Sequence, residues 1–339
     1  LAAGGSLATA RALDRQLGAD PAAAATLARR IAAGELDTPV ALRAGEPKRL
    51  ARALMLEAMV RNMLGPRQWK KADQLIAQAQ SLVQHIGGKV PLAGIYLAGG
   101  IILHQRGRSN EGVETFRKAE ALLDVPDPEA TWVRLLVRGG KLVALCNQGR
   151  FAEMEQDLPA YMDEIEDRGD VVMLTNAQIV GVSLALARDD VAQARRLLAK
   201  LQELAARHSG SNQVEMGIVG EILIALYEDP KQAGERFLTD WVKRLQADQN
   251  SRDFQRHFWL LHLEACALLS SPTAQSHLPR LRRIVTQLQK LKVARALALA
   301  AALRATLAQR FATEPDVDAL WIAAEQAFAK AEQPLPVAY

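Results

Sequence analysis

Two residues in the C-terminal half carry side chains that can bind metals or act as nucleophiles. His262 and Cys266 are four residues apart, so a helix would place them on one face. There, an imidazole and a thiolate could bind zinc or form a nucleophilic pair. Glu264 falls off that face, His257 lies outside the stripe, and residues 258–261 are aromatic and apolar. We therefore expect a packed helix with a buried cysteine, no metal, no cofactor and no catalytic residue.

A stripe of three cations is the second candidate site. Arg134, Arg138 and Lys141 follow one another at helical spacing and therefore share one face of a helix. Guanidinium and ammonium groups on one stripe could hold a carboxylate or a phosphate of a partner peptide. Asn147, beyond the stripe, and Asn176, further along the chain, could add hydrogen bonds. These residues form the predicted partner-binding site, and an exposed helix face without a partner is the alternative.

Two segments of opposite charge follow the stripe. Residues 153–170 hold eight acids and one arginine. Carboxylates this close together could serve acid–base chemistry, but a solvated outer helix face is the expected arrangement. Residues 265–313 contain no acid and carry a basic patch. The patch consists of Arg280, Arg282, Arg283, Lys290, Lys292 and Arg295.

Such a patch could meet an acidic protein, a nucleic acid or a membrane surface. Nucleic acid is not expected as a partner, because aromatic residues are not interleaved with these charges. Solvated arginines on the backs of helices are the alternative interpretation. The separation of acidic and basic segments would also let one copy of the chain stack on another, so self-association is a further hypothesis.

The composition indicates which elements must position these residues. The chain has 339 residues, 49% apolar and 24% charged, which is the balance of a globular protein. Only 5% are aromatic, and the many Ala and Leu residues favour helices over strands. The net charge of +4 is mild, and no apolar run is long enough for a transmembrane helix. Two cysteines far apart in sequence suit a reducing compartment, so a cytoplasmic location is expected.

Turn residues recur along the chain at a spacing of about 41 residues, which predicts a repeat. The first series is Gly65, Gly107, Gly149, Asp189, Asp229 and Ser270. The second series falls between these and is Gly87, Asp127, Gly169, Ser209, Asn250 and Leu291. Two interleaved series of one period predict two helices in each repeat.

A helical hairpin cannot bury its apolar face alone, so neighbouring hairpins must stack. We therefore predict an all-α fold, a right-handed α-solenoid of tetratricopeptide-like hairpins. About seven hairpins fit into residues 46–332. Residues 1–45 are predicted to form an N-terminal cap or linker helices, and residues 333–339 a C-terminal tail. The first helices would line a concave groove for a protein or peptide partner.

One repeat follows the tetratricopeptide pattern closely. Small residues at Gly100, Gly112 and Ala119 would let its two helices approach each other. Phe116 would fill the remaining gap between them, and Gly107 lies at the turn.

Several stretches resemble the C-terminal tetratricopeptide-like region of bacterial Hanks-type serine/threonine kinases, of the kind found in myxobacteria and planctomycetes. They are residues 51–58, 106–120, 158–170, 186–196 and 291–305. The resemblance implies a non-catalytic module that binds partners or regulates the kinase. The kinase motifs themselves are absent, so no catalytic residue carries over. A helical-repeat regulator of a STAND-type ATPase or of a transcription factor is one alternative, and an enzyme of unrecognised type is another.

Overall fold

The computed structural model describes residues 47–125, 127–208, 211–241, 244 and 254–333. Within these ranges the chain forms fourteen α-helices and no strand, which confirms the all-α prediction. None of the helices described is both long and apolar enough to cross a membrane. The cap or linker predicted for residues 1–45 lies outside the described residues, as does the predicted tail beyond Gln333.

The helices follow one another as seven pairs. They are α3 (Pro47–Met63) with α4 (Trp69–Ile86), α5 (Lys89–Gln105) with α6 (Ser109–Leu122), α7 (Pro128–Asn147) with α8 (Phe151–Arg168), α9 (Val171–Ala187) with α10 (Val191–His208), α11 (Ser211–Glu228) with α12 (Pro230–Arg236), α14 (Phe254–Ser270) with α15 (Leu278–Leu291), and α16 (Ala294–Phe311) with α17 (Val317–Lys330). A π-helical turn, Phe237–Trp241, continues α12. Short 3-10 turns, Pro66–Gln68 and Ala274–His277, precede α4 and α15.

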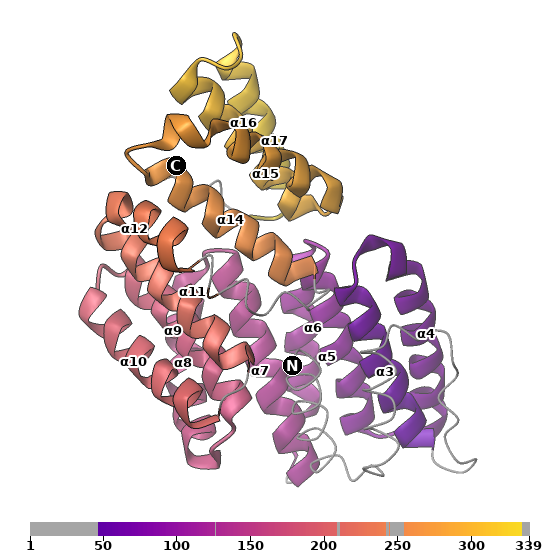
Figure 1. Cartoon of the computed structure of the whole chain (residues 1–339). Coiled ribbons are helices and arrows are strands. Elements are labelled where there is room, and N and C mark those ends of the chain that lie inside the picture. The colour runs from indigo at the N-terminus through magenta and orange to yellow at the C-terminus, as the bar shows by residue number, and fades with distance from the viewer. Residues whose placement is uncertain (1–46, 126, 209–210, 242–243, 245–253, 334–339) are drawn as a thin grey trace.

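Each helix packs against its neighbours along the chain. The two helices of every pair contact each other, and the second helix of each pair contacts the first helix of the next. The first helices of consecutive pairs also contact one another. Figure 1 shows α3–α12 side by side in a row, with α14–α17 gathered above the upper ends of these helices in the view. These contacts cover the apolar face that a single pair leaves exposed.

Three successive pairs, α5–α10, share one type of turn. In the α5–α6 turn, the Arg108 N–H donates to the Leu103 carbonyl at 3.0 Å, and equivalent bonds close the next two turns. This is the Schellman arrangement, which requires a left-handed residue just after the helix. Gly107 and Gly149 supply it with φ of 87° and 67°, and Asp189 does so with φ of 60°. Three of the predicted turn residues, Gly107, Gly149 and Asp189, therefore mark true helix ends, whereas Ser209 and Asn250 lie outside the described residues.

Phe116 on α6 fills the gap between two first helices. Its ring lies so close to Gly100 on α5 and Gly140 on α7 that an added Cβ would meet ring atoms at 2.6 Å and 2.9 Å. A Cβ on Gly112 would meet the Gly100 carbonyl oxygen at 3.1 Å. Ala119, one turn beyond Phe116, is fully buried. The predicted role of these small residues in close helix approach is confirmed.

The last pair of helices returns to pairs far earlier in the chain. The Asn110 N–H, at the start of α6, donates to the Glu332 carboxylate at 2.6 Å. The Gln333 side chain donates to the backbone carbonyl of Asn147, at the end of α7, at 3.1 Å. Trp69 of α4 packs against the apolar core of α14–α17. The C-terminal helices therefore cover the turns that join the helices of the early pairs.

The contact between Gly100 and Phe116 leads to a first prediction. Gly100→Ala should lower the free energy of unfolding by about 1–3 kcal/mol, because the ring is buried and cannot move aside freely. The neighbouring Gly99→Ala is the matched control, since its Cβ would meet only Thr115 Cγ2, at 3.8 Å. That change should stabilise the helix by up to about 1 kcal/mol. Urea unfolding followed by circular dichroism measures both, and equal effects would contradict the packing.

Candidate functional site

The cations of the predicted stripe lie on α7 and are paired within the chain. Arg134 Nη2 lies 3.4 Å from Glu164 Oε1 on α8. Arg138 lies between two acids, with Nη1 at 3.0 Å from Glu164 and Nε at 3.3 Å from Glu120 on α6. Both arginine side chains are partly exposed. The stripe therefore ties α7 to α6 and α8, and its contact with a partner stays a prediction.

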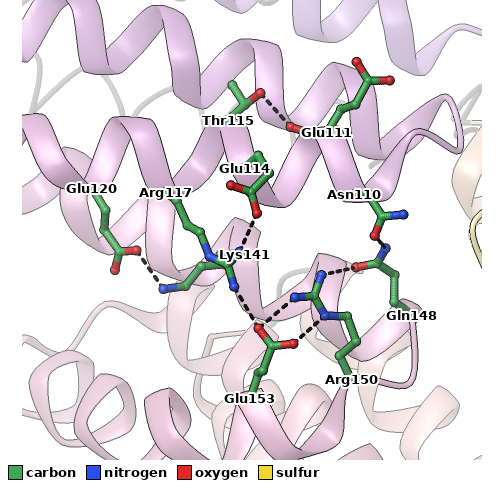
Figure 2. Close-up of polar contacts among 10 residues, drawn as sticks. All are labelled: Asn110, Glu111, Glu114, Thr115, Arg117, Glu120, Lys141, Gln148, Arg150 and Glu153. Carbon is green, nitrogen blue, oxygen red and sulfur yellow. Dashed lines mark hydrogen bonds and ion pairs between the residues drawn. The ribbon is translucent and has the colours of Figure 1, made fainter.

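Lys141 is the most buried member of the stripe, at 8% exposed. Its Nζ lies 2.7 Å from Glu120 Oε2 and 2.9 Å from Asp157 Oδ2. Figure 2 shows this ammonium group reaching from α7 to the α6 carboxylate. A buried ammonium group is stable only when it is paired, so Lys141 serves as an internal link between helices.

Figure 2 also shows a second link between α6 and α8, formed by Arg117 and Glu153. Glu153 accepts from Arg117 Nη2 at 2.8 Å and from Arg150 Nε at 2.5 Å. Beside them, the Gln148 amide donates to Asn110 Oδ1 at 2.7 Å. The Arg150 and Arg117 guanidinium groups hold the pKa of Glu153 below its ordinary value, mainly through the Arg150 hydrogen bond.

Most of the acidic segment, residues 153–170, is occupied in the same way. Glu155 pairs with Arg188 at 2.5 Å, and Glu166 pairs with Lys200 at 3.0 Å. Asp170 caps the start of α9 by accepting from two backbone N–H groups. Glu155 and Glu166 therefore join neighbouring helices, and Asp170 caps a helix.

The other two predicted binding residues lie apart. Asn176 is exposed on α9. Asn147 is half-buried at the end of α7, where its Nδ2 lies 3.1 Å from His104 Nε2. Asn147 therefore belongs to the interior cluster described below.

The basic patch lies mainly on α15. Five of its members are exposed: Arg280, Arg282, Arg283, Lys290 and Lys292. The opposite face of α15 is apolar and buried, with Leu281, Ile284 and Leu288 in the C-terminal core. Arg280 pairs with Glu264 of α14.

The remaining exposed cations of α15 are less constrained. Arg282 lies near Glu314 and helps to lower the pKa of that carboxyl, although the hydrogen bond from Arg304 is the larger cause. Within the described part of the chain, Arg283, Lys290 and Lys292 form no ion pair. Arg283 and Lys290 are seven residues apart and therefore share one face of the helix.

The predicted His–Cys pair lies on one face of α14. His262 Nε2 is 3.9 Å from Cys266 Sγ, and both residues are half-buried. Glu264 points elsewhere, because it pairs with Arg280. The described residues hold no group of three side chains able to bind a metal, and the His257 side chain lies outside them. His262 and Cys266 therefore lie together as their spacing predicts, and Glu264 does not join them.

A buried polar cluster lies where the C-terminal helices meet α5 and α7. His104 of α5 is buried, and its Nδ1 is 3.1 Å from Ser109 Oγ. The Asn147 amide donates to its Nε2, which leaves the proton on Nδ1 to be donated to Ser109. Burial, and then the charge of Arg295, lower the pKa of His104 to about 3. This histidine is therefore neutral at physiological pH.

Arg295 does not belong to the surface patch. It begins α16 and is only 3% exposed, with its guanidinium carbon 5.3 Å from the Phe258 ring centre and 5.4 Å from that of Trp259. The same guanidinium acts on His104 and Cys146. The sequence predicted Arg295 as part of a basic patch on the helix surfaces of residues 265–313. The contact between α16 and the α5–α6 turn buries it instead.

Sequence reasoning did not single out His104 or Cys146 as site residues. The signal available was that both end an apolar first helix, immediately before a turn. Their neighbour Arg295 comes from another pair of helices, far beyond both of them in the chain. No local pattern could therefore have joined the three residues.

Comparisons with known proteins add no family to this description. A scan against protein-family models, a search of curated proteins and a search of solved structures each found no match.

The neutral state of His104 leads to a prediction about pH. The unfolded chain binds a proton at this residue below the ordinary pKa of 6.5, whereas the folded chain does so only near pH 3. The free energy of unfolding should therefore fall as the pH drops. His104 should contribute about 2 kcal/mol of that fall between pH 7 and pH 5. His104→Gln should remove that part of the loss, and the exposed His85→Gln should not. Urea unfolding at both pH values measures it, and an unchanged slope in His104→Gln would contradict it.

The pairing of Lys141 leads to a further prediction. Lys141→Met keeps the apolar stem and removes the ammonium group shared by Glu120 and Asp157. The free energy of unfolding should fall by about 1–3 kcal/mol, because two partly buried acids lose a partner. Lys200→Met is the control, since its pair with Glu166 is exposed and contributes only about 0–1 kcal/mol. Chemical unfolding in 0.15 M salt compares them, and equal losses would refute an internal role for Lys141.

Proposed function

We propose that this chain is a non-catalytic protein-interaction module. In this proposal the seven pairs form one right-handed solenoid with a repeat of about 41 residues. The first helices support it, because they begin at residues 47, 89, 128, 171, 211, 254 and 294. The regular contacts between consecutive first helices also support it, since a solenoid buries its core in this way.

The exposed face of α15 is the proposed site for a partner. The single observation that carries this choice is the contrast between two sets of cations. Arg134, Arg138 and Lys141 are neutralised by acids of the same chain, whereas Arg283 and Lys290 are exposed and pair with no acid in the part of the chain that the structure describes. Unpaired cations on a rigid helix attract an acidic segment of another protein. An acidic partner would thus pair with the cations of α15 in the way that acids of the chain itself pair with the cations of α7.

The context proposed for this module is bacterial signalling. The resemblance to the tetratricopeptide-like region of Hanks-type serine/threonine kinases supports a regulatory part of such a kinase, in which partner binding controls or localises the enzyme. The test of this context is whether the gene that encodes the chain also encodes a kinase domain. An ATPase domain in its place would instead favour the STAND-type alternative.

Binding of an acidic peptide tests the site on α15. The probe is a fluorescein-labelled peptide of alternating Glu and Leu residues, followed by fluorescence anisotropy in 0.15 M salt. Arg283→Glu combined with Lys290→Glu should weaken binding by about 10-fold or more, because two attractive charges become repulsive. Lys118→Glu combined with Arg196→Glu is the matched control. It changes the net charge equally and alters exposed residues of α6 and α10.

Equal weakening by both double variants would show that only net charge matters and would refute a site on α15. Arg134→Glu combined with Arg138→Glu tests the stripe on α7 in the same assay. A loss of binding confined to that variant would move the site to the predicted groove. Duplex DNA serves as the competing ligand, and a preference for DNA over the peptide would favour the transcriptional alternative.

A further inference from the structure

Arg295 is a buried cation without a counter-ion among the described residues. It is 3% exposed, and neither its Nε nor its Nη1 has a hydrogen-bond partner among the described residues. Both atoms are also shielded from solvent. Two aromatic rings contact the guanidinium, but neither ring carries the net negative charge that would neutralise it. An unpaired charged donor in the protein interior costs more free energy than an unpaired neutral donor does.

Other shielded arginines in the structure do have a carboxylate. Arg61 is also 3% exposed, and its Nε donates to Glu57 at 2.8 Å. Arg106 lies 2.8 Å from Asp73 through Nη1. Arg295 therefore differs from both Arg61 and Arg106.

The groups around Arg295 do not supply the missing negative charge. Burial, and then Arg295 itself, lower the pKa of His104 to about 3 and that of His262 to about 4, so both imidazoles are neutral. Burial raises the pKa of the Cys146 thiol to about 11, although Arg295 and Ser183 act in the opposite direction. Cys146 is the one group of the described chain that favours the charged state of Arg295. The cluster thus carries a net charge of about +1 at neutral pH.

The backbone adds positive potential at the same place. Arg295 lies in the first turn of α16, where the N–H groups of a helix point outward. The N-cap residue, Val293, makes no side-chain cap, and the first turn contains no acid. Gly107 of the α5–α6 turn approaches closely, since a Cβ there would lie 3.2 Å from Ala294 Cβ. Four helices, α5, α7, α14 and α16, therefore enclose an electropositive interior.

We propose that this interior is a binding site for a small monovalent anion of halide size, held by Arg295 between α5, α7, α14 and α16. One negative charge matches the single uncompensated guanidinium. The shielding of Nε and Nη1 excludes a large ligand. It also means that the guanidinium must shift off the two rings to bind the anion, or that the anion is enclosed as α16 docks on the α5–α6 turn. The anion stabilises the return of the last pair of helices to the early pairs.

Thermal unfolding of the full chain tests the site, with chloride as the probe. Sodium chloride replaces sodium gluconate at a constant ionic strength of 0.2 M, so only the identity of the anion changes. The melting temperature should rise by about 2–4 °C and approach a plateau, as expected for saturable binding to the folded state. Arg295→Met should remove this rise. Arg282→Met is the matched control, because it removes one exposed charge from the neighbouring helix and should keep the full rise.

A second measurement holds even if Arg295→Met does not fold. Crystals of the unaltered protein grown in sodium bromide should show an anomalous bromide peak within hydrogen-bond distance of the Arg295 guanidinium. The absence of that peak overturns the proposal, as does an equal chloride effect in Arg295→Met and the unaltered protein. A thiolate absorbance of Cys146 at neutral pH, without any chloride effect, would identify the thiolate as the counter-ion and also overturn it.

Discussion

Every pair of helices in this protein has an apolar face that the next pair must cover. The surfaces buried in this way contain charged and polar side chains as well as Ala and Leu. A charge that loses water must be paired, or must be held in its neutral form, for the contact to be stable. Close helix approach adds a second demand, because Phe116 leaves space for hydrogen alone at Gly100 and Gly140. Most polar contacts described above are solutions to these two demands.

The chain uses different solutions at different depths. Partly exposed arginines of α7 bind acids of α6 and α8, while the buried Lys141 binds two acids at once. His104, deeper still, is held neutral and makes two hydrogen bonds to neutral groups. Arg295 follows neither route, since it is charged and its Nε and Nη1 have no partner among the described residues. That exception is the physical reason for assigning an external anion to this cluster.

This distribution of charge also bears on how the chain could meet other proteins. Side chains that neutralise one another between helices are poorly suited to hold a partner, because a partner would have to displace an acid already in place. Among the described residues, Arg283 and Lys290 of α15 face no such competition. The apolar face of the same helix is anchored in the C-terminal core, which keeps those cations on a rigid support. The proposed partner surface is therefore on α15 rather than on α7.

The sequence by itself determined the helical class, the positions of the turns and the plug formed by Phe116 with Gly100 and Gly112. These depend on spacing and on residue size within one or two neighbouring helices, which a linear pattern records. It also identified the cations of α7 and α15, but not which of them are neutralised. Only the tertiary structure decided that Arg134 and Arg138 meet acids of α8, and that Arg295 is buried beside His104. Burial and pairing depend on which distant helix covers a residue, and periodicity along one helix carries no information about that.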